Sequence, residues 1–551
     1  MIKYNKRSIK NKRRLACLGD KNFKKEIIMK RIITLLLAVA MLAGVVMLAV
    51  ACGGNPDVTT TNGGKTTTTG SSGGVTTTGN SGNVTTTGGS SGVTTTGNSG
   101  ATTTSGGSDD PTEWDGLTKL PGKEHVDFGG RTFFIASRDD GQGYDTTNEV
   151  WVESLTGNAY NDSVYERNKI MQELYNCTIK VDKNGQDGYD ADFASGGGKY
   201  IASTAQYGQP FITKGYYNVH SLGIDLGQEW WDQNYINDLT YDGKLYSIIG
   251  DFARLAMGCT WVVIFNKTVY ENRGIDDDIY QLVRDRKWTI DKMMEMSSKA
   301  VYDTDGSTDY KVGSSADSDI IGFTSSAFSY RGFYLGCGER FVSTDSSGKF
   351  KVALTDGKGA EVIDKIIKFY NTDGYQNSSY TVTDAAMRAD KILFEGELLE
   401  KLRLFEDAET LEIGVLPFPL YDENQERYYV NSDNHLPVYG IPTSFADTEV
   451  INDFWTLYAA HSRYTVRKAY VDSCKYVWTS DEENGDMMEI ILNSRIFDPG
   501  YNWNLATSFI NILGTMIEGN DNRFSGYANK QVRAIQSNIE NFDTKIGGLE
   551  R

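Results

Sequence analysis

The longest run of apolar residues lies close to the start of the chain. Lys30 and Arg31 precede it, the run itself extends from Ile32 to Val50, and Ala51 and Cys52 follow. A basic start, an apolar stretch and a small residue before a cleavage point are typical of an export signal rather than of a fold element. The cysteine predicts a lipoprotein signal, in which the Cys52 thiol is acylated and becomes the new N-terminus. The alternative is an ordinary transmembrane helix, because 19 apolar residues can span a bilayer.

Two further segments lack the apolar positions that a folded element needs. Residues 1–28 are basic and polar, and we interpret them as a mis-assigned start or as a long basic region of the signal segment 1–51. Residues 52–111 follow the cysteine with Thr, Gly, Ser and Asn and almost no apolar side chains, so they cannot bury enough surface to fold. We expect a disordered tether with a root-mean-square span of roughly 40 Å. Because the signal segment predicts export, the function is predicted to be performed outside the membrane.

From residue 112 onward, strand and helix patterns alternate. Residues 131–137 form a short apolar run after a Gly-Gly turn and predict a buried strand. The next segment, 161–176, has one apolar helical face, and Ser163 and Glu166 have the spacing of a capping box. Residues 177–181 then return as a strand. Two strands joined by a helix are typical of a parallel sheet.

The alternation continues over the rest of the chain. Further strands are predicted at 245–249, 260–265, 413–416 and 438–441, and further helices at 289–296, 360–370, 447–460, 486–492, 506–517 and 528–542. Thr289 is expected to cap the first of these helices. About 440 residues exceed the size of one compact core and indicate two lobes. The fold class predicted from the pattern is α/β.

The net charge limits the kinds of binding partner, and the cysteine pattern bears on disulfides and zinc sites. The whole chain has a formal net charge of −18, and residues 1–51 carry 12 Lys/Arg against 2 Asp/Glu, a net +10, which leaves −28 for the remainder. An acidic surface argues against nucleic acid and anionic lipid as partners, and weakly favours a neutral or cationic ligand. Four cysteines lie singly beyond the tether without a CxxC pair, so we expect buried thiols rather than disulfides or zinc ligands: Cys177, Cys259, Cys337 and Cys474.

Aromatic residues make up 12% of the chain, and many stand beside polar residues in loop-like contexts. A ring can stack on the apolar face of a pyranose while planar polar groups pair with its hydroxyls. These neighbourhoods favour a hydroxylated ligand. The alternative for any single ring is that it anchors a loop to the core. Such pairings occur at 216–218, 230–234, 329–331 and 499–503.

Signals for catalysis are weak. The four histidines are not spaced for metal binding, and no HExxH motif is present. Ser346 and Lys349 match SxxK inside a hairpin-turn sequence, and Asp303, Asp305 and Asp309 lack the distal Glu of a calcium loop. Nothing in the sequence pairs two carboxylates as the acid and base of a glycosidase. We predict a protein that is not an enzyme and has no cofactor or metal.

Nine segments spread between about 124 and 500 carry a family resemblance. They are VDFGGRTFFI, GNAYNDSVYERNKIMQELYNCTIKV, WWDQNYINDLTYDGKLYSIIGDFA, WVVIFNKTVYENRGI, RKWTIDKM, NTDGYQ, LFEGELLEKLRLFED, IGVLPFPLYDENQERYY and VYGIPTS. Together these segments resemble the extracellular solute-binding proteins of carbohydrate ABC transporters, the maltose-binding-like family 1. The resemblance is strongest to a lipid-anchored subgroup of anaerobic Gram-positive bacteria. It implies a two-lobed, periplasmic-binding-protein-like class II fold whose lobes are joined by crossing hinge strands.

The resemblance also implies an organisation and a site. Lobe one is expected at 124–250 plus 443–497 and lobe two at 262–437 plus 502–551, with crossings near 248–260, 438–442 and 497–501. Ligand in the cleft would close a hinge, and the closed monomer would dock on permease subunits. The ligand-binding residues implied by position are Trp230, Trp231, Asp251, Arg254, Tyr330, Arg331, Arg403, Asp433, Asn434, His435 and Trp503.

The expected function is capture of a sugar or oligosaccharide and its delivery to an ABC importer at the outer face of the cell membrane. Two alternatives remain open. One is a binding protein for another solute such as a peptide, and the other is a surface protein that binds or cleaves glycans.

Overall fold

The structure is a computed structural model. It describes residues 114–137, 146–183, 185–206, 208–307, 310–313, 318–325, 328–377, 380–408, 410–479 and 481–549. These belong to one compact unit, Gly106–Arg551. The predicted export signal, Cys52 and the tether lie outside the described residues. None of the helices within the described ranges is long and apolar enough to cross a membrane.

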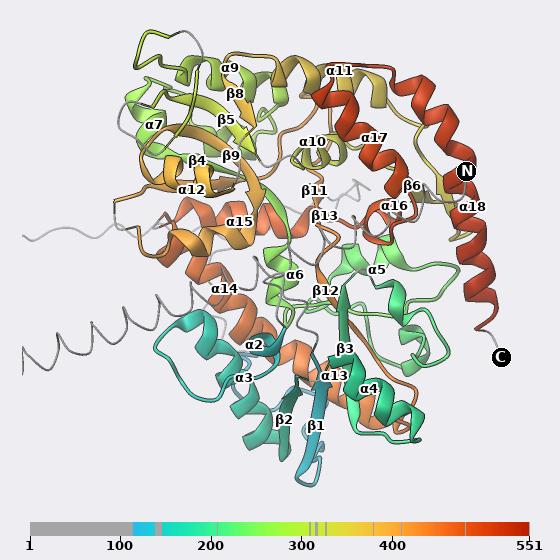
Figure 1. Ribbon diagram of the computed structural model, residues 1–551. Helices are drawn as coiled ribbons and strands as arrows, with labels where there is room; N and C mark the ends of the chain where they lie inside the picture. Colours follow the sequence, from blue (N-terminus) through green and yellow to red (C-terminus); the bar gives the residue numbers. More distant parts are fainter. Residues whose placement is uncertain are drawn as a thin grey trace, which may run out of the picture. The chain divides into compact units, whose positions relative to one another are not determined.

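The first sheet contains the predicted βαβ unit. Its strand order is β12 (Pro437–Gly440), β3 (Tyr200–Gln206), β1 (Arg131–Ala136) and β2 (Cys177–Asp182). Strands β2 and β3 run parallel to β1, whereas β12 is antiparallel to β3. Helix α3 (Ala159–Tyr175) packs on β2, and α4 (Gly185–Ala194) packs on β3 (Figure 1). A strand from late in the chain thus completes a sheet built by early strands.

The second sheet is made of five strands from the middle of the chain. Its order is β10 (Ile413–Leu416), β4 (Trp261–Asn266), β9 (Ile392–Leu398), β5 (Ile321–Ser325) and β8 (Tyr375–Asn377). Strand β4 is antiparallel to both of its neighbours, and β5 is parallel to β8 and β9. The fold is therefore mixed α/β with two sheets, which agrees with the α/β class predicted from the sequence.

Helices and short strands surround the two sheets (Figure 1). A nearly continuous helix is formed by α13 (Thr448–Ser462), η4 (Arg463–Arg467), α14 (Lys468–Ser473) and η5 (Cys474–Trp478), in which η4 and η5 are π-helical. The others are α2 (Thr147–Val150), η1 (Gln209–Phe211), η2 (Val219–Leu222), α5 (Gln233–Leu239), α6 (Arg254–Gly258), α7 (Lys267–Asn272), α8 (Ile279–Arg284), α9 (Ile290–Ala300), α10 (Tyr330–Gly336), β6 (Val342–Thr344), β7 (Phe350–Val352), α11 (Gly359–Tyr370), α12 (Tyr380–Arg388), η3 (Leu399–Phe405), β11 (Val430–Asn431), α15 (Glu483–Asn493), β13 (Arg495–Ile496), α16 (Pro499–Asn502), α17 (Thr507–Glu518) and α18 (Phe524–Gly547).

Two chain segments connect the sheets and lie side by side. Ile248 pairs with Tyr439 at the first sheet, and Thr260 pairs with Ser432 beside the second. Helix α6 occupies the segment between Ile248 and Thr260. The parallel pair β11 and β13 brings a third segment to the same place. We call the region where these three segments meet the junction.

Two local predictions are wrong. Asn158, not Ser163, caps α3, because its side chain accepts from the amide of Asn161. Ser163 lies inside the helix and its hydroxyl donates to the carbonyl of Tyr160. Residues 245–249 make one isolated bridge rather than a strand of a sheet, because Ile248 alone meets a partner. The cap at Thr289 is confirmed by its contact with the amide of Lys292.

The lobe bounds remain a proposal, with one revision. Helix α13 packs on α3, beside the first sheet, whereas α15 packs on β10 of the second sheet. The amide of Val415 on β10 donates to the side chain of Asn484 on α15. We therefore place 483–493 with lobe two.

Candidate functional site

Asp433 is the centre of a polar network at the junction. Its carboxylate accepts hydrogen bonds from the indole of Trp261 at 2.9 Å, from the hydroxyl of Tyr501 at 2.6 Å and from the amide and Nδ1 of His435. The main-chain amide of Asp433 donates to the carbonyl of Cys259. Asp433 is 4% exposed, so its hydrogen bonds connect the crossing segments in the interior of the protein.

Hydrogen bonding keeps this buried carboxylate charged. Burial of Asp433 would raise its pKa, but hydrogen bonds from His435 and Tyr501 outweigh that effect and hold the pKa below the ordinary value. An ionised acceptor makes shorter and stronger hydrogen bonds than a neutral one. The carboxylate therefore fixes the orientation of Tyr501 and His435.

The outer edge of the network is formed by partly buried side chains. Arg331 donates from an NH group to the hydroxyl of Tyr501 at 3.1 Å. Asn434 donates weakly to the side chain of Asn504 at 3.4 Å. Arg331, Asn434 and His435 are all less buried than Asp433. We call these three side chains the junction edge. Together with Asp433 they are four predicted site residues that lie in or beside one network.

A local capping motif positions Tyr501. Asp498 begins α16, Pro499 follows at the first helical position, and the Asp498 side chain accepts from the amides of Gly500 and Tyr501. It also accepts from the amide of Phe341 at 2.8 Å, which attaches this turn to the region before β6. Burial raises the pKa of Asp498 to about 6. The network members Trp261 and Asn504 were not predicted, and Tyr501 was singled out only within the aromatic stretch 499–503. The sequence Asp-Pro-Gly-Tyr carries a recognisable capping signal that was not used.

Two other predicted site residues meet elsewhere, around Tyr160. The guanidinium carbon of Arg254 lies 3.9 Å from the centre of the Tyr160 ring, and that of Arg403 lies 4.5 Å from it. Arg254 donates to the carbonyls of Tyr160 and Asn148, and Arg403 forms an ion pair with Glu400. We call Tyr160, Arg254, Arg403 and Glu400 the Tyr160 cluster. It connects α3, which packs on the first sheet, with η3, which follows β9 of the second sheet.

Glu149 adjoins this cluster and is completely buried. Its carboxyl accepts from the hydroxyl of Tyr439 on β12 and from the amide of Leu255 on α6 at 2.7 Å. Desolvation raises the pKa of Glu149 to about 7, against the opposing effect of Tyr439 and the nearby arginines. The carboxyl thus ties α2 to the first crossing segment.

Asp251 and the two adjacent tryptophans lie in a third place. Asp251 forms ion pairs with Arg463 at 3.0 Å and Arg467 at 3.2 Å, and burial raises its pKa to about 6 against the effect of these cations. Trp230 and Trp231 are 9% and 3% exposed. Asp251 therefore already has internal partners, and neither indole presents an open face.

Tyr330 and Trp503 are also packed inside. Trp503 is 2% exposed, and its ring contacts those of Phe350 and Phe542 with centroids 5.6 Å and 5.0 Å away. Tyr330 is 5% exposed and donates its hydroxyl to the carbonyl of Ile510. In this conformation neither ring has a surface on which a sugar could stack.

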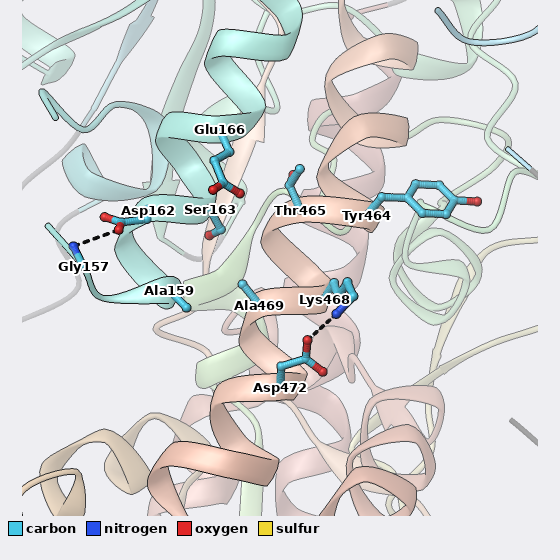
Figure 2. A pocket seen from close by; sticks show the side chains of 10 residues that line it. All are labelled: Gly157, Ala159, Asp162, Ser163, Glu166, Tyr464, Thr465, Lys468, Ala469 and Asp472. Atoms are coloured by element: carbon cyan, nitrogen blue, oxygen red, sulfur yellow. Dashed lines mark hydrogen bonds and ion pairs between the residues drawn. The ribbon is translucent and has the colours of Figure 1, made fainter. Parts of the chain in front are cut away.

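A separate surface pocket of about 390 Å³ lies between α3 and the helix that contains α14 (Figure 2). None of the predicted site residues lines it. Asp162 accepts from the amide of Gly157, and Lys468 pairs with Asp472, so two of its carboxylates are internally satisfied. Its lining residues are Gly157, Ala159, Asp162, Ser163, Glu166, Tyr464, Thr465, Lys468, Ala469 and Asp472.

The motifs considered for catalysis or metal binding make local structural contacts among the described residues, and Asp309 lies outside those residues. Residues 345–349 form the turn between the antiparallel strands β6 and β7, as expected of a hairpin. Asp303, Asp305 and Asp319 place carboxylate oxygens within 4.8 Å of one another. Asp319 accepts from the amides of Thr304 and Lys311, so it also organises the surrounding loop. The four predicted free cysteines are confirmed as buried and unbridged.

Comparisons with known proteins find similarity in structure. No protein-family model matches the chain, and no curated protein sequence does. An ABC substrate-binding protein from Listeria monocytogenes in complex with cycloalternan is 12% identical, with a TM-score of 0.43 over 76% of this chain and 98% of that one. The maltose-binding protein MalE of the same organism is 14% identical, with a TM-score of 0.47 over 75% and 98%. A designed esterase is 12% identical, with a TM-score of 0.48 over 74% and 100%. The chain is thus similar to carbohydrate ABC solute-binding proteins at low identity.

Proposed function

We propose that this protein is an extracellular, lipid-anchored solute-binding protein that captures a sugar or oligosaccharide between two lobes and delivers it to an ABC importer. The observation that carries the proposal is the junction edge. Arg331, Asn434 and His435 lie where the crossing segments meet, and the buried carboxylate of Asp433 supports them. Planar polar groups beside aromatic rings are suited to sugar hydroxyls.

The same geometry supports a capture mechanism. Asn434 and His435 belong to a segment that connects the two sheets, and Arg331 on α10 reaches the same place through Tyr501. A ligand that contacts this edge can therefore be reached by side chains from both lobes. Lobes joined by a few crossing segments can close around a ligand by small backbone rotations in those segments. A ligand with more contacts in the closed form shifts the population toward it. The closed monomer is then the form that permease subunits would recognise.

The proposal is tested by ligand screening of the mature chain carrying Cys52→Ser. Thermal-shift measurements against mono- and oligosaccharides, with short peptides as a comparison set, should give a sugar that raises the melting temperature. Calorimetry then measures its affinity. Stabilisation by peptides alone would favour the other solute class. Because we propose no enzymatic activity, chromatography should show the sugar intact after prolonged incubation, and steady product formation would contradict us.

The hypothesis that a tryptophan stacks on a pyranose is tested with Trp230→Ala, Trp231→Ala and Trp503→Ala. A stacking ring at the centre of a site typically contributes about 2 kcal/mol or more, which corresponds to roughly thirtyfold in affinity. Removing a buried Trp also costs about 3–5 kcal/mol of stability. Affinity is therefore measured on folded protein at low temperature. If all three variants bind as tightly as the parent, the rings only support the fold.

Lipid anchoring has its own test. The sequence around Cys52 predicts acylation of its thiol, so Cys52→Ser should move the full-length protein from the membrane fraction to the soluble fraction of producing cells. Cys177→Ser is the matched control, because that thiol is buried in the folded domain. Retention of the Cys52→Ser protein in the membrane fraction would show that the apolar segment itself is the anchor.

A further inference from the structure

Arg331 differs from the other partly or fully buried arginines in what its guanidinium group touches. Arg254 and Arg340 donate to main-chain carbonyl oxygens, and Arg403 pairs with a carboxylate. Among the described residues, the hydrogen bond of Arg331 goes to the phenol of Tyr501, and no ion pair neutralises its charge. Its Nε atom is buried without a partner in that part of the chain.

Aromatic rings enclose the Arg331 guanidinium. Its central carbon lies 4.5 Å from the centre of the Phe328 ring, 5.2 Å from that of Tyr501 and 5.6 Å from that of Tyr330. Rings hold a guanidinium in place through cation–π attraction without neutralising it. They also exclude water, which strengthens the attraction between the cation and any anion that reaches it.

The nearest carboxylate of the network does not neutralise Arg331 either. Asp433 accepts from Trp261, Tyr501 and His435, so its lone pairs are occupied. Tyr501 lies between the two charges, because its hydroxyl accepts from Arg331 and donates to Asp433. The positive charge of Arg331 therefore remains available at the junction edge.

We propose that the captured ligand carries a carboxylate, as in an oligosaccharide containing a uronic acid, and that Arg331 binds this group. The inference rests on the proposed function and specifies its ligand class. The planar fork of an arginine matches a carboxylate with two parallel N–H···O hydrogen bonds. Because the mature chain has a net charge near −28, its general field repels anions. Recognition must therefore depend on this local cation.

The test compares two disaccharides that differ only in oxidation at C6, digalacturonate and α-1,4-linked digalactose. Calorimetry of the mature Cys52→Ser chain should show tighter binding of digalacturonate. Arg331→Gln should weaken that binding by about thirtyfold or more, the usual loss for one partner of a desolvated charge pair. Its effect on digalactose should stay within about threefold. Thermal shifts with glucuronate against glucose extend the comparison to another sugar.

Two further variants separate recognition from folding. Arg340→Gln is the matched control, because Arg340 also lies over a tyrosine ring, 4.8 Å from the centre of Tyr429, but donates to a carbonyl. It should leave both affinities unchanged. Tyr501→Phe keeps the Arg331 charge and removes the shared hydroxyl, so digalacturonate should still bind better than digalactose even if Arg331→Gln does not fold.

The outcomes distinguish this inference from the proposed function. Equal or tighter binding of neutral sugars, or an unchanged digalacturonate affinity in Arg331→Gln, would overturn the inference and leave sugar capture intact. Binding of peptides with no response to either type of sugar would overturn both.

Discussion

The junction edge and the Tyr160 cluster use the same residue types in different ways. Each combines arginine, tyrosine and a carboxylate, and each joins segments associated with different sheets. In the Tyr160 cluster, Arg254 donates to two carbonyls and Arg403 pairs with Glu400. At the junction, Asp433 bonds to Tyr501 and His435 instead, and Arg331 keeps its charge.

The comparison shows that the acceptors around a guanidinium, more than its position in the chain, determine its role. An arginine surrounded by carbonyls and carboxylates strengthens the fold, because its hydrogen bonds are satisfied internally. The guanidinium of Arg331 donates to a phenol, which does not neutralise it, so we propose that it retains donors for a ligand. We therefore propose that the Tyr160 cluster holds the lobes together and that the junction edge binds the ligand.

The strongest test of this distinction removes the centre of the junction. Asp433→Ala leaves Trp261, Tyr501 and His435 without their shared acceptor in a buried place. Leaving such donors unpaired should lower the free energy of unfolding by about 3–5 kcal/mol. Chemical denaturation measures the loss, and binding of the identified sugar should fall with it.

Asp373→Ala is the control for Asp433→Ala, because Asp373 is an exposed carboxylate in a turn. Its effect should stay within about 0.5 kcal/mol. A similarly small effect at Asp433 would mean that its hydrogen bonds contribute little and that the junction is not organised around it.

The pH dependence of stability tests the buried carboxyl beside the Tyr160 cluster. The pKa of Glu149 is raised from 4.5 to about 7 in the folded state. Between these pH values the folded state binds more protons than the unfolded state. The contribution of Glu149 to the free energy of unfolding is therefore fully present below pH 4.5 and is lost as the pH rises through 7. Glu149→Gln cannot ionise. Its free energy of unfolding relative to that of the parent should increase by roughly 2–3 kcal/mol between pH 4 and pH 8.

Denaturation series at both pH values measure this gain. Glu271→Gln, at an exposed position on α7, is the matched control and should follow the parent. If the free energies of unfolding of the parent and Glu149→Gln change with pH in the same way, the carboxyl does not titrate in this range. Ligand affinity at the junction edge should be unaffected, since Glu149 is not part of it.

The smallest expected effect is that of Arg403→Ala. Its side chain is 38% exposed and pairs with Glu400, and partly exposed ion pairs contribute about 1 kcal/mol or less. The variant should therefore lose about 1 kcal/mol of stability and keep its sugar affinity within twofold. A tenfold loss of affinity would instead restore Arg403 as a ligand-binding residue, as the family resemblance implied.

Local physical chemistry accounts for what the sequence by itself determined. Short apolar runs predicted β1, β2 and β10, because such runs are typical of strands that pack in a core. Strand β10 is buried along its whole length, whereas β1 and β2 each have one exposed residue. Thr289 was predicted as a helix cap because a hydroxyl before an apolar helical face satisfies a free amide. The alternation of these elements was sufficient for the α/β class. Asn158 was missed because Ser163 offered the same capping chemistry five residues later.

Only the tertiary structure decided which of the predicted site residues meet. Eleven candidates share residue types suited to sugars, but Trp503 is packed against Phe350 and Phe542, and Arg254 is surrounded by carbonyls. Arg331 and Asp433 are about a hundred residues apart and are connected through Tyr501. Burial and partnership depend on contacts between distant segments, which local patterns do not encode. The sequence therefore determined the elements, and the packing of those elements decided that Arg331 has a phenol as its hydrogen-bond partner while Arg403 has a carboxylate.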